Sequence, residues 1–173
     1  MAVRELDVFH GIVLSRLMQE VPAAIRLVEH DANEYGVYEV DGFEGQRGGV
    51  TFYVKYSATP RPGARSRGRY WLFSFNEQHL DKLGQQVAAG PTYLALVCGK
   101  NNLKASVPPM QICILSAEEV ANLIDLSSRS TEWIRVDYEP RKWLAVTGSE
   151  LPKPGLKVPQ NRLDAIAGGI RAA

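Results

Sequence analysis

The feature that most restricts the fold of this chain is an apolar run without alternation near its middle. Tyr93-Leu-Ala-Leu-Val-Cys98 contains no charged residue, and Ile112-Cys-Ile-Leu115 repeats the pattern over a shorter stretch. A strand with one face in water alternates apolar and polar side chains, whereas a strand that is covered on both faces forms a continuous apolar run. The chain is therefore expected to place a sheet between other elements.

Helix signals lie on both sides of these strands. Apolar residues recur at three- and four-residue spacing between Val3 and Glu20, which predicts an amphipathic helix. Asn76 is a suitable N-cap for a helix over 77–87. Ser116-Ala-Glu-Glu119 is a capping-box sequence, and it predicts a helix over 117–126.

Other segments have the composition of strands. Two of them, 35–41 and 50–57, are expected to form a hairpin with its turn near residues 45 and 46. That turn would place Lys55 opposite Gly36 and Tyr53 opposite Tyr38. Further strands are expected over 25–29, 70–75, 131–138 and 142–147.

The order of these elements predicts a single α/β (α+β) domain with a central mixed β-sheet that is flanked by helices. A length of 173 residues suits one domain with an adequate core. We divide it into a core over 1–126, followed over 127–173 by a C-terminal β-hairpin and a Pro-rich tail.

Composition points to a cytoplasmic protein. Cys98 and Cys113 lie inside apolar strand runs, where a thiol packs as a small apolar group. The first twenty residues carry several charges, unlike a signal peptide, and no run approaches the length of a membrane span. The sequence also lacks the common phosphate-loop, dinucleotide, nucleophile-elbow and zinc-protease motifs.

Charge is unevenly distributed along the chain. The formal net charge is only +1, yet the stretch between Glu44 and Glu77 contains six cationic residues and no acid. Four of the arginines lie in a Pro/Gly/Ser loop, and two aromatic residues that could stack on bases follow it. The stretch predicts a nucleic-acid-binding set that consists of Arg47, Arg61, Arg65, Arg67, Arg69, Tyr70 and Trp71.

The segment that ends in Phe52-Tyr-Val-Lys55 adds a second indication. A helix, a β-hairpin and a strand lysine in this order, up to about Leu115, resemble the restriction-endonuclease-like, or PD-(D/E)XK, superfamily. The resemblance implies an α-β-β-β-α-β core. It also implies an acid near the second strand and an acid two residues before the lysine, which together hold Mg²⁺. In this chain Tyr53 occupies the second of these positions.

The resemblance also implies which residues would act if the protein were an enzyme. Lys55 would be the catalytic lysine, and Glu34, the acid expected nearest to it, the surviving catalytic carboxylate. Glu34 and Asp41 are the candidate ligands for Mg²⁺, the only cofactor expected.

Three functions follow from these observations. The leading expectation is a nucleic-acid-binding protein on a catalytically degenerate nuclease-like scaffold, in a mobile-element or phage-defence setting. DNA is preferred to RNA as its partner, no membrane is expected, and a homodimer is an open option. The alternatives are a Mg²⁺-dependent nuclease and a protein-interaction or oligomerisation module for an acidic partner protein. Whether the protein is an enzyme is left open.

Overall fold

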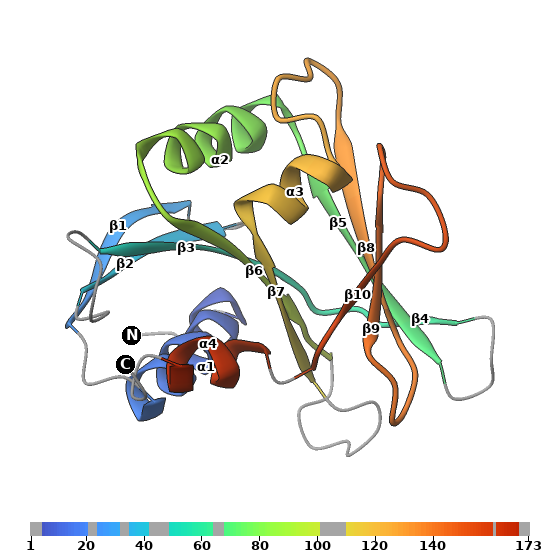
Figure 1. The fold of residues 1–173 in the computed structure, drawn as a ribbon, viewed down its shortest axis with the longest axis horizontal. Helices are drawn as coiled ribbons and strands as arrows, with labels where there is room; N and C mark the ends of the chain where they lie inside the picture. Colours follow the sequence, from blue (N-terminus) through green and yellow to red (C-terminus); the bar gives the residue numbers. More distant parts are fainter. Residues whose placement is uncertain are drawn as a thin grey trace.

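The computed structural model describes residues 5–20, 24–31, 35–41, 49–63, 68–100, 110–160 and 162–169. These residues form two sheets and four helices (Figure 1). In chain order the elements are α1 (Glu5–Glu20), β1 (Ala24–Asp31), β2 (Tyr35–Asp41), β3 (Val50–Ser57), β4 (Arg61–Pro62), β5 (Arg69–Phe75), α2 (Glu77–Ala89), β6 (Thr92–Cys98), β7 (Gln111–Ser116), α3 (Ala117–Leu123), β8 (Glu132–Tyr138), β9 (Leu144–Gly148), β10 (Leu156–Val158) and α4 (Arg162–Gly169).

The first sheet has the strand order β1-β2-β3-β6-β7. Strands β3 and β6 are parallel and the other pairs are antiparallel, so the sheet is mixed. The two apolar runs became β6 and β7. Their side chains are buried on both faces of the sheet, as the absence of alternation predicted.

Helices α1 and α4 pack on one face of this sheet. Phe9, Val13 and Leu17 of α1 are buried against Phe52 and Val54 of β3, and Leu163 of α4 joins the same cluster. Figure 1 shows α1 and α4 side by side on this face, with the other two helices on the opposite side.

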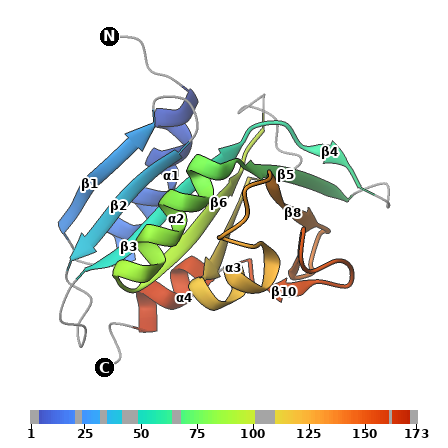
Figure 2. The same cartoon turned by 90° about the horizontal axis from the view of Figure 1, so that it is seen from above.

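The second sheet closes the opposite face. It is antiparallel, with the strand order β10-β9-β8-β5-β4. Its inner side chains, among them Trp71, Phe73 and Val136, share one buried cluster with Tyr53 of β3 and Leu94 of β6. Helices α2 and α3 fill the remaining space on that side (Figures 1 and 2).

The predicted class is confirmed: the protein is a single α/β domain with a mixed sheet flanked by helices. The local signals are confirmed as well. The Asn76 side chain accepts a hydrogen bond from the His79 N–H, and Ser116 and Glu119 form the reciprocal capping box. The C-terminal hairpin is present as β8 and β9, and the Pro-rich tail adds β10 at the sheet edge.

Two expectations require correction. The predicted hairpin register was wrong by one residue, because Lys55 lies opposite Tyr35 and Tyr53 lies opposite Val37. A one-residue slip moves a strand's side chains to the other face, so Tyr35 and not Gly36 shares the face of Lys55. In addition, β5 does not join the central sheet; it pairs with β8 in a second sheet. Among the described residues, no helix is long and apolar enough to cross a membrane.

Candidate nucleic-acid interface

The outer face of the second sheet is set by the alternation of β8. Ile134, Val136 and Tyr138 are buried toward the core, whereas Trp133 and Arg135 lie between them and point outward. A sheet with only one face packed on the core leaves the other face available to a ligand. We call this outer surface, from β4 to β10, the outer face.

The register identifies which side chains are neighbours on the outer face. One row crosses all five strands and begins and ends with a cation: Lys157, Ala145, Asp137, Tyr70 and Arg61. A second row joins Thr147, Arg135 and Leu72. A third joins Trp133 and Ser74.

Aromatic side chains are exposed on or beside this face. Trp133 is 37% exposed and Trp143, at the start of β9, is 60% exposed, although such residues are normally covered. The Arg135 guanidinium carbon lies 3.8 Å from the centroid of the Tyr70 ring. Planar groups of this kind are the surfaces on which bases stack.

Arg135 is held in place by a carboxylate. Its Nε and Nη2 atoms donate to the two oxygens of Asp137 at 2.7 and 2.6 Å. This bidentate pair fixes the guanidinium plane and raises the pKa of Arg135. A similar pairing joins Lys142 to Glu139 at 2.7 Å. Asp137 and Glu139 are thus each balanced by a neighbouring cation.

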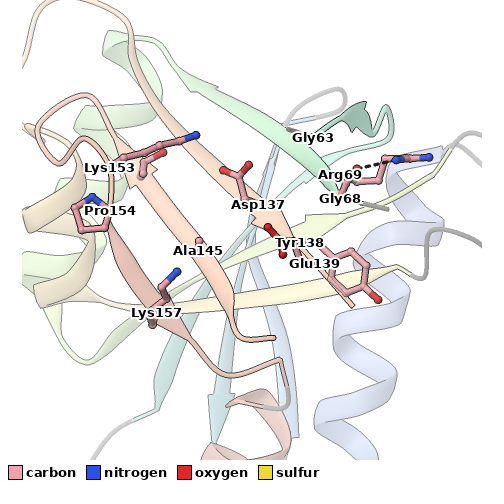
Figure 3. Close-up of a pocket in the computed structure, with 11 residues that line it drawn as sticks. Gly63, Gly68, Arg69, Asp137, Tyr138, Glu139, Ala145, Lys153, Pro154 and Lys157 are labelled. Atoms are coloured by element: carbon pink, nitrogen blue, oxygen red, sulfur yellow. Dashed lines mark hydrogen bonds between the residues drawn. The ribbon is translucent and has the colours of Figure 1, made fainter. Parts of the chain in front are cut away.

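The face is hollowed where the tail crosses it. A cavity of about 440 Å³ lies between β5, β8, β9 and the segment before β10. Figure 3 shows Lys153 and Lys157 on one side of it, Asp137 in the middle and Arg69 beyond Asp137. The cations of the hollow and its surroundings outnumber the acids, so the field there favours an anion. The cations are Arg61, Arg69, Arg135, Lys142, Lys153 and Lys157.

The predicted nucleic-acid-binding residues have three different outcomes. Arg61 and Tyr70 belong to the row that crosses the outer face, and Arg69 lines its hollow. Trp71 is fully buried and its indole donates to the Gly99 carbonyl at 2.8 Å, so its ring is not accessible to a base. Arg47, Arg65 and Arg67 lie outside the described residues.

The nuclease-like residues lie elsewhere. Lys55 is only 6% exposed, beneath α2, where its Nζ is 3.2 Å from His79 Nδ1 and 5.4 Å from the centroid of the Phe75 ring. Tyr53 is buried on the same face and stacks on Tyr35. The face of β3 that carries Tyr53 and Lys55 is therefore part of the core.

Asp41, one of the two candidate metal ligands, lies far from Lys55. Lys55 lies opposite Tyr35, at the start of β2, whereas Asp41 ends that strand. Six residue steps of about 3.3 Å separate the two positions by roughly 20 Å. Glu34 lies outside the described residues. Within the described ranges, no three His, Cys, Asp or Glu side chains converge as a metal site.

Sequence analysis missed most of the outer face. The predicted binding set includes none of Trp133, Arg135, Trp143, Lys153 and Lys157. The alternation of β8 was the available signal: a strand that buries Ile134 and Val136 must expose Trp133 and Arg135.

Comparison of this chain with family models, with curated proteins and with solved structures found no match.

Proposed function

We propose that this protein binds nucleic acid through the outer face of its second sheet. The observation that carries the proposal is the row from Lys157 to Arg61, which has a cation at each edge and the Tyr70–Arg135 stack beside its middle. Cations at the edges would contact phosphates, and planar groups between them would contact bases. DNA is the first ligand to test and RNA the second.

The scaffold is proposed to bind without cutting. A hydrolytic lysine has to approach the scissile phosphate, whereas Lys55 is buried against His79 beneath α2. The tyrosine two residues before it is also buried, and a phenol is a poor ligand for Mg²⁺. Both observations favour the degenerate scaffold over a Mg²⁺-dependent nuclease.

The experiment is a binding assay with fluorescein-labelled 20-nucleotide DNA and RNA, each as a single strand and as a duplex, at about 50 mM salt. Mg²⁺ is included in a parallel series, and the products are examined for cleavage. We expect retention of at least one nucleic acid without cleavage. Failure to bind any of the four nucleic acids would refute the proposal. Cleavage that depends on Mg²⁺ would show that the protein is a nuclease.

Matched variants locate the surface. Arg61→Ala and Lys157→Ala each remove one exposed cation from opposite edges of the outer face. Arg16→Ala removes an exposed cation from α1, on the far side of the first sheet, and serves as the control. We expect the first two to weaken binding and the control to leave it unchanged. Equal effects of all three would indicate non-specific attraction.

A protein-interaction module for an acidic partner is the second candidate. The exposed apolar side chains of the edge strand β1, Leu27 and Val28, favour it, since an open edge can pair with another strand. This function uses the opposite end of the molecule from the outer face. Double substitution Leu27→Thr/Val28→Thr should therefore leave nucleic-acid binding intact, and loss of that binding would assign the interface to β1.

A further inference from the structure

The arrangement of Tyr70, Arg135 and Asp137 indicates a more specific ligand than an anion in general. Arg135 is already neutralised by a bidentate carboxylate, so it gains less from a phosphate than an unpaired arginine would. Its guanidinium carbon instead lies over an aromatic ring, 3.8 Å from the ring centroid. Tyr70 thus contacts the guanidinium, and Arg135 remains partly exposed on the outer face.

We infer that the ligand is single-stranded and that Arg135, held by Asp137 on the Tyr70 ring, is a stacking platform for one of its bases. The inference rests on the proposed function and specifies its ligand. Guanidinium planes and aromatic rings both stack on bases that have been unpaired. A duplex keeps its bases inside the helix, so its base faces cannot reach such a platform.

Spacing along β8 supports a single strand. Trp133 and Arg135 point to the same side and are two residues apart, which places them about 7 Å from each other. Stacked nucleotides follow one another at about 3.4 Å along each strand of B-form DNA. Platforms at twice that spacing leave room for a base beside each of them only when the bases are unstacked from one another.

The phosphates of such a strand would contact other side chains. Lys157 and Arg61 lie at the two ends of the row, separated by four strand spacings of about 4.8 Å, or roughly 19 Å. Bases near Arg135 would therefore lie between two cationic margins. The two effects therefore depend on different residues. Base stacking depends on Arg135, and the salt dependence of binding depends on Lys157 and Arg61.

The test uses four probes and three proteins. The probes are a 20-nucleotide single strand of DNA, the same length with abasic sites at its central positions, the corresponding duplex and inorganic phosphate as a competitor. The proteins are the wild type, Arg135→Lys and Lys157→Ala. The abasic strand keeps every phosphate and loses the central bases, and Arg135→Lys keeps the charge and loses the plane.

For the wild type we expect the single strand to bind at least about tenfold more tightly than the duplex, and the abasic strand about fivefold or more weakly than the intact one. Arg135→Lys should weaken binding of the intact strand and remove the difference between intact and abasic strands, with the slope of affinity against salt unchanged. Lys157→Ala should lower that slope and keep the difference. Phosphate at millimolar concentration should compete only weakly.

Some results would overturn the inference and others the proposed function. Absence of binding to every nucleic acid refutes both. Duplex binding as tight as single-strand binding, or equal affinity of the wild type for intact and abasic strands, refutes the inference alone. Tyr70→Leu is a second variant in case Arg135→Lys lowers the melting temperature. It removes the ring beneath the guanidinium and should also abolish the difference in affinity between the intact and abasic strands. If both variants fold and still bind the intact strand more tightly than the abasic strand, Arg135 is not a stacking platform.

Discussion

Raising the salt concentration should weaken binding by a predictable factor. Each phosphate that a cation neutralises on a single strand contributes about −0.7 to the slope of log affinity against log salt. We assign one contact each to Arg61, Lys153 and Lys157, which lie on the outer face or line its hollow. Arg135 and Lys142 are left out because Asp137 and Glu139 already neutralise them.

Three contacts give a slope of about −2.1, so a fourfold increase in salt from about 50 to 200 mM should lower affinity about 20-fold. Lys157→Ala removes one contact, and the same increase in salt should then lower affinity only about 7-fold. Fluorescence anisotropy of the labelled single strand at three or more salt concentrations measures both slopes.

The control is Arg16→Ala, which should keep the wild-type slope because α1 lies beyond the first sheet. A wild-type slope near zero would show that phosphate contacts do not hold the ligand. A slope reduced by Arg16→Ala and not by Lys157→Ala would place the ligand on the wrong side of the molecule for this account.

Three further predictions concern the scaffold. Glu119→Gln should cost about 1–2 kcal/mol at neutral pH, because Glu119 bonds both the Ser116 N–H and Arg162 of α4. Burial alone would raise the pKa of Glu119, but its bonds to Arg162 and Ser116 lower it below the ordinary 4.5. The stabilisation is therefore fully present above pH 4.5 and is lost as the pH falls through the lowered pKa, so the unfolding free energies of the two proteins in urea titrations should converge in acid. Gly148→Ala should destabilise by about 1–3 kcal/mol in thermal unfolding, since its Cβ would lie 2.0 Å from the Leu123 carbonyl oxygen; an unchanged melting temperature would contradict the close approach of α3 to β9. Lys55→Met should leave oligonucleotide affinity within about twofold of the wild type, because Lys55 lies in the core, and a larger loss in the folded variant would return Lys55 to the binding surface.

Sequence signals predicted the elements better than their partners. Asn76 and the Ser116–Glu119 box carry local chemistry that works in any tertiary context, and both helix starts were correct. Alternation along β3 places Tyr53 in one buried cluster and Phe52 and Val54 in the other. It could not show which face α2 would cover, so Lys55 was expected on a surface and lies in the core.

The sequence did not predict which distant strands pair with each other. Burial alternates along β5, with Phe73 and Phe75 buried on either side of the exposed Ser74, but nothing local selects β8 as its partner. The binding surface depends on that pairing, because it brings Tyr70 beneath Arg135, 65 positions later in the chain. The one-residue slip of the β2–β3 hairpin has a similar origin, since a long glycine-rich connection does not fix a register.

Photo-crosslinking tests the central claim most directly. A single-stranded oligonucleotide that carries photoreactive bases is bound, irradiated and digested with the protein, and the modified peptides are identified by mass spectrometry. The account predicts adducts in β5 and in the β8–β9 hairpin, at or beside Tyr70, Trp133 and Trp143. Adducts concentrated on α1 or on β1, with none on the second sheet, would contradict it.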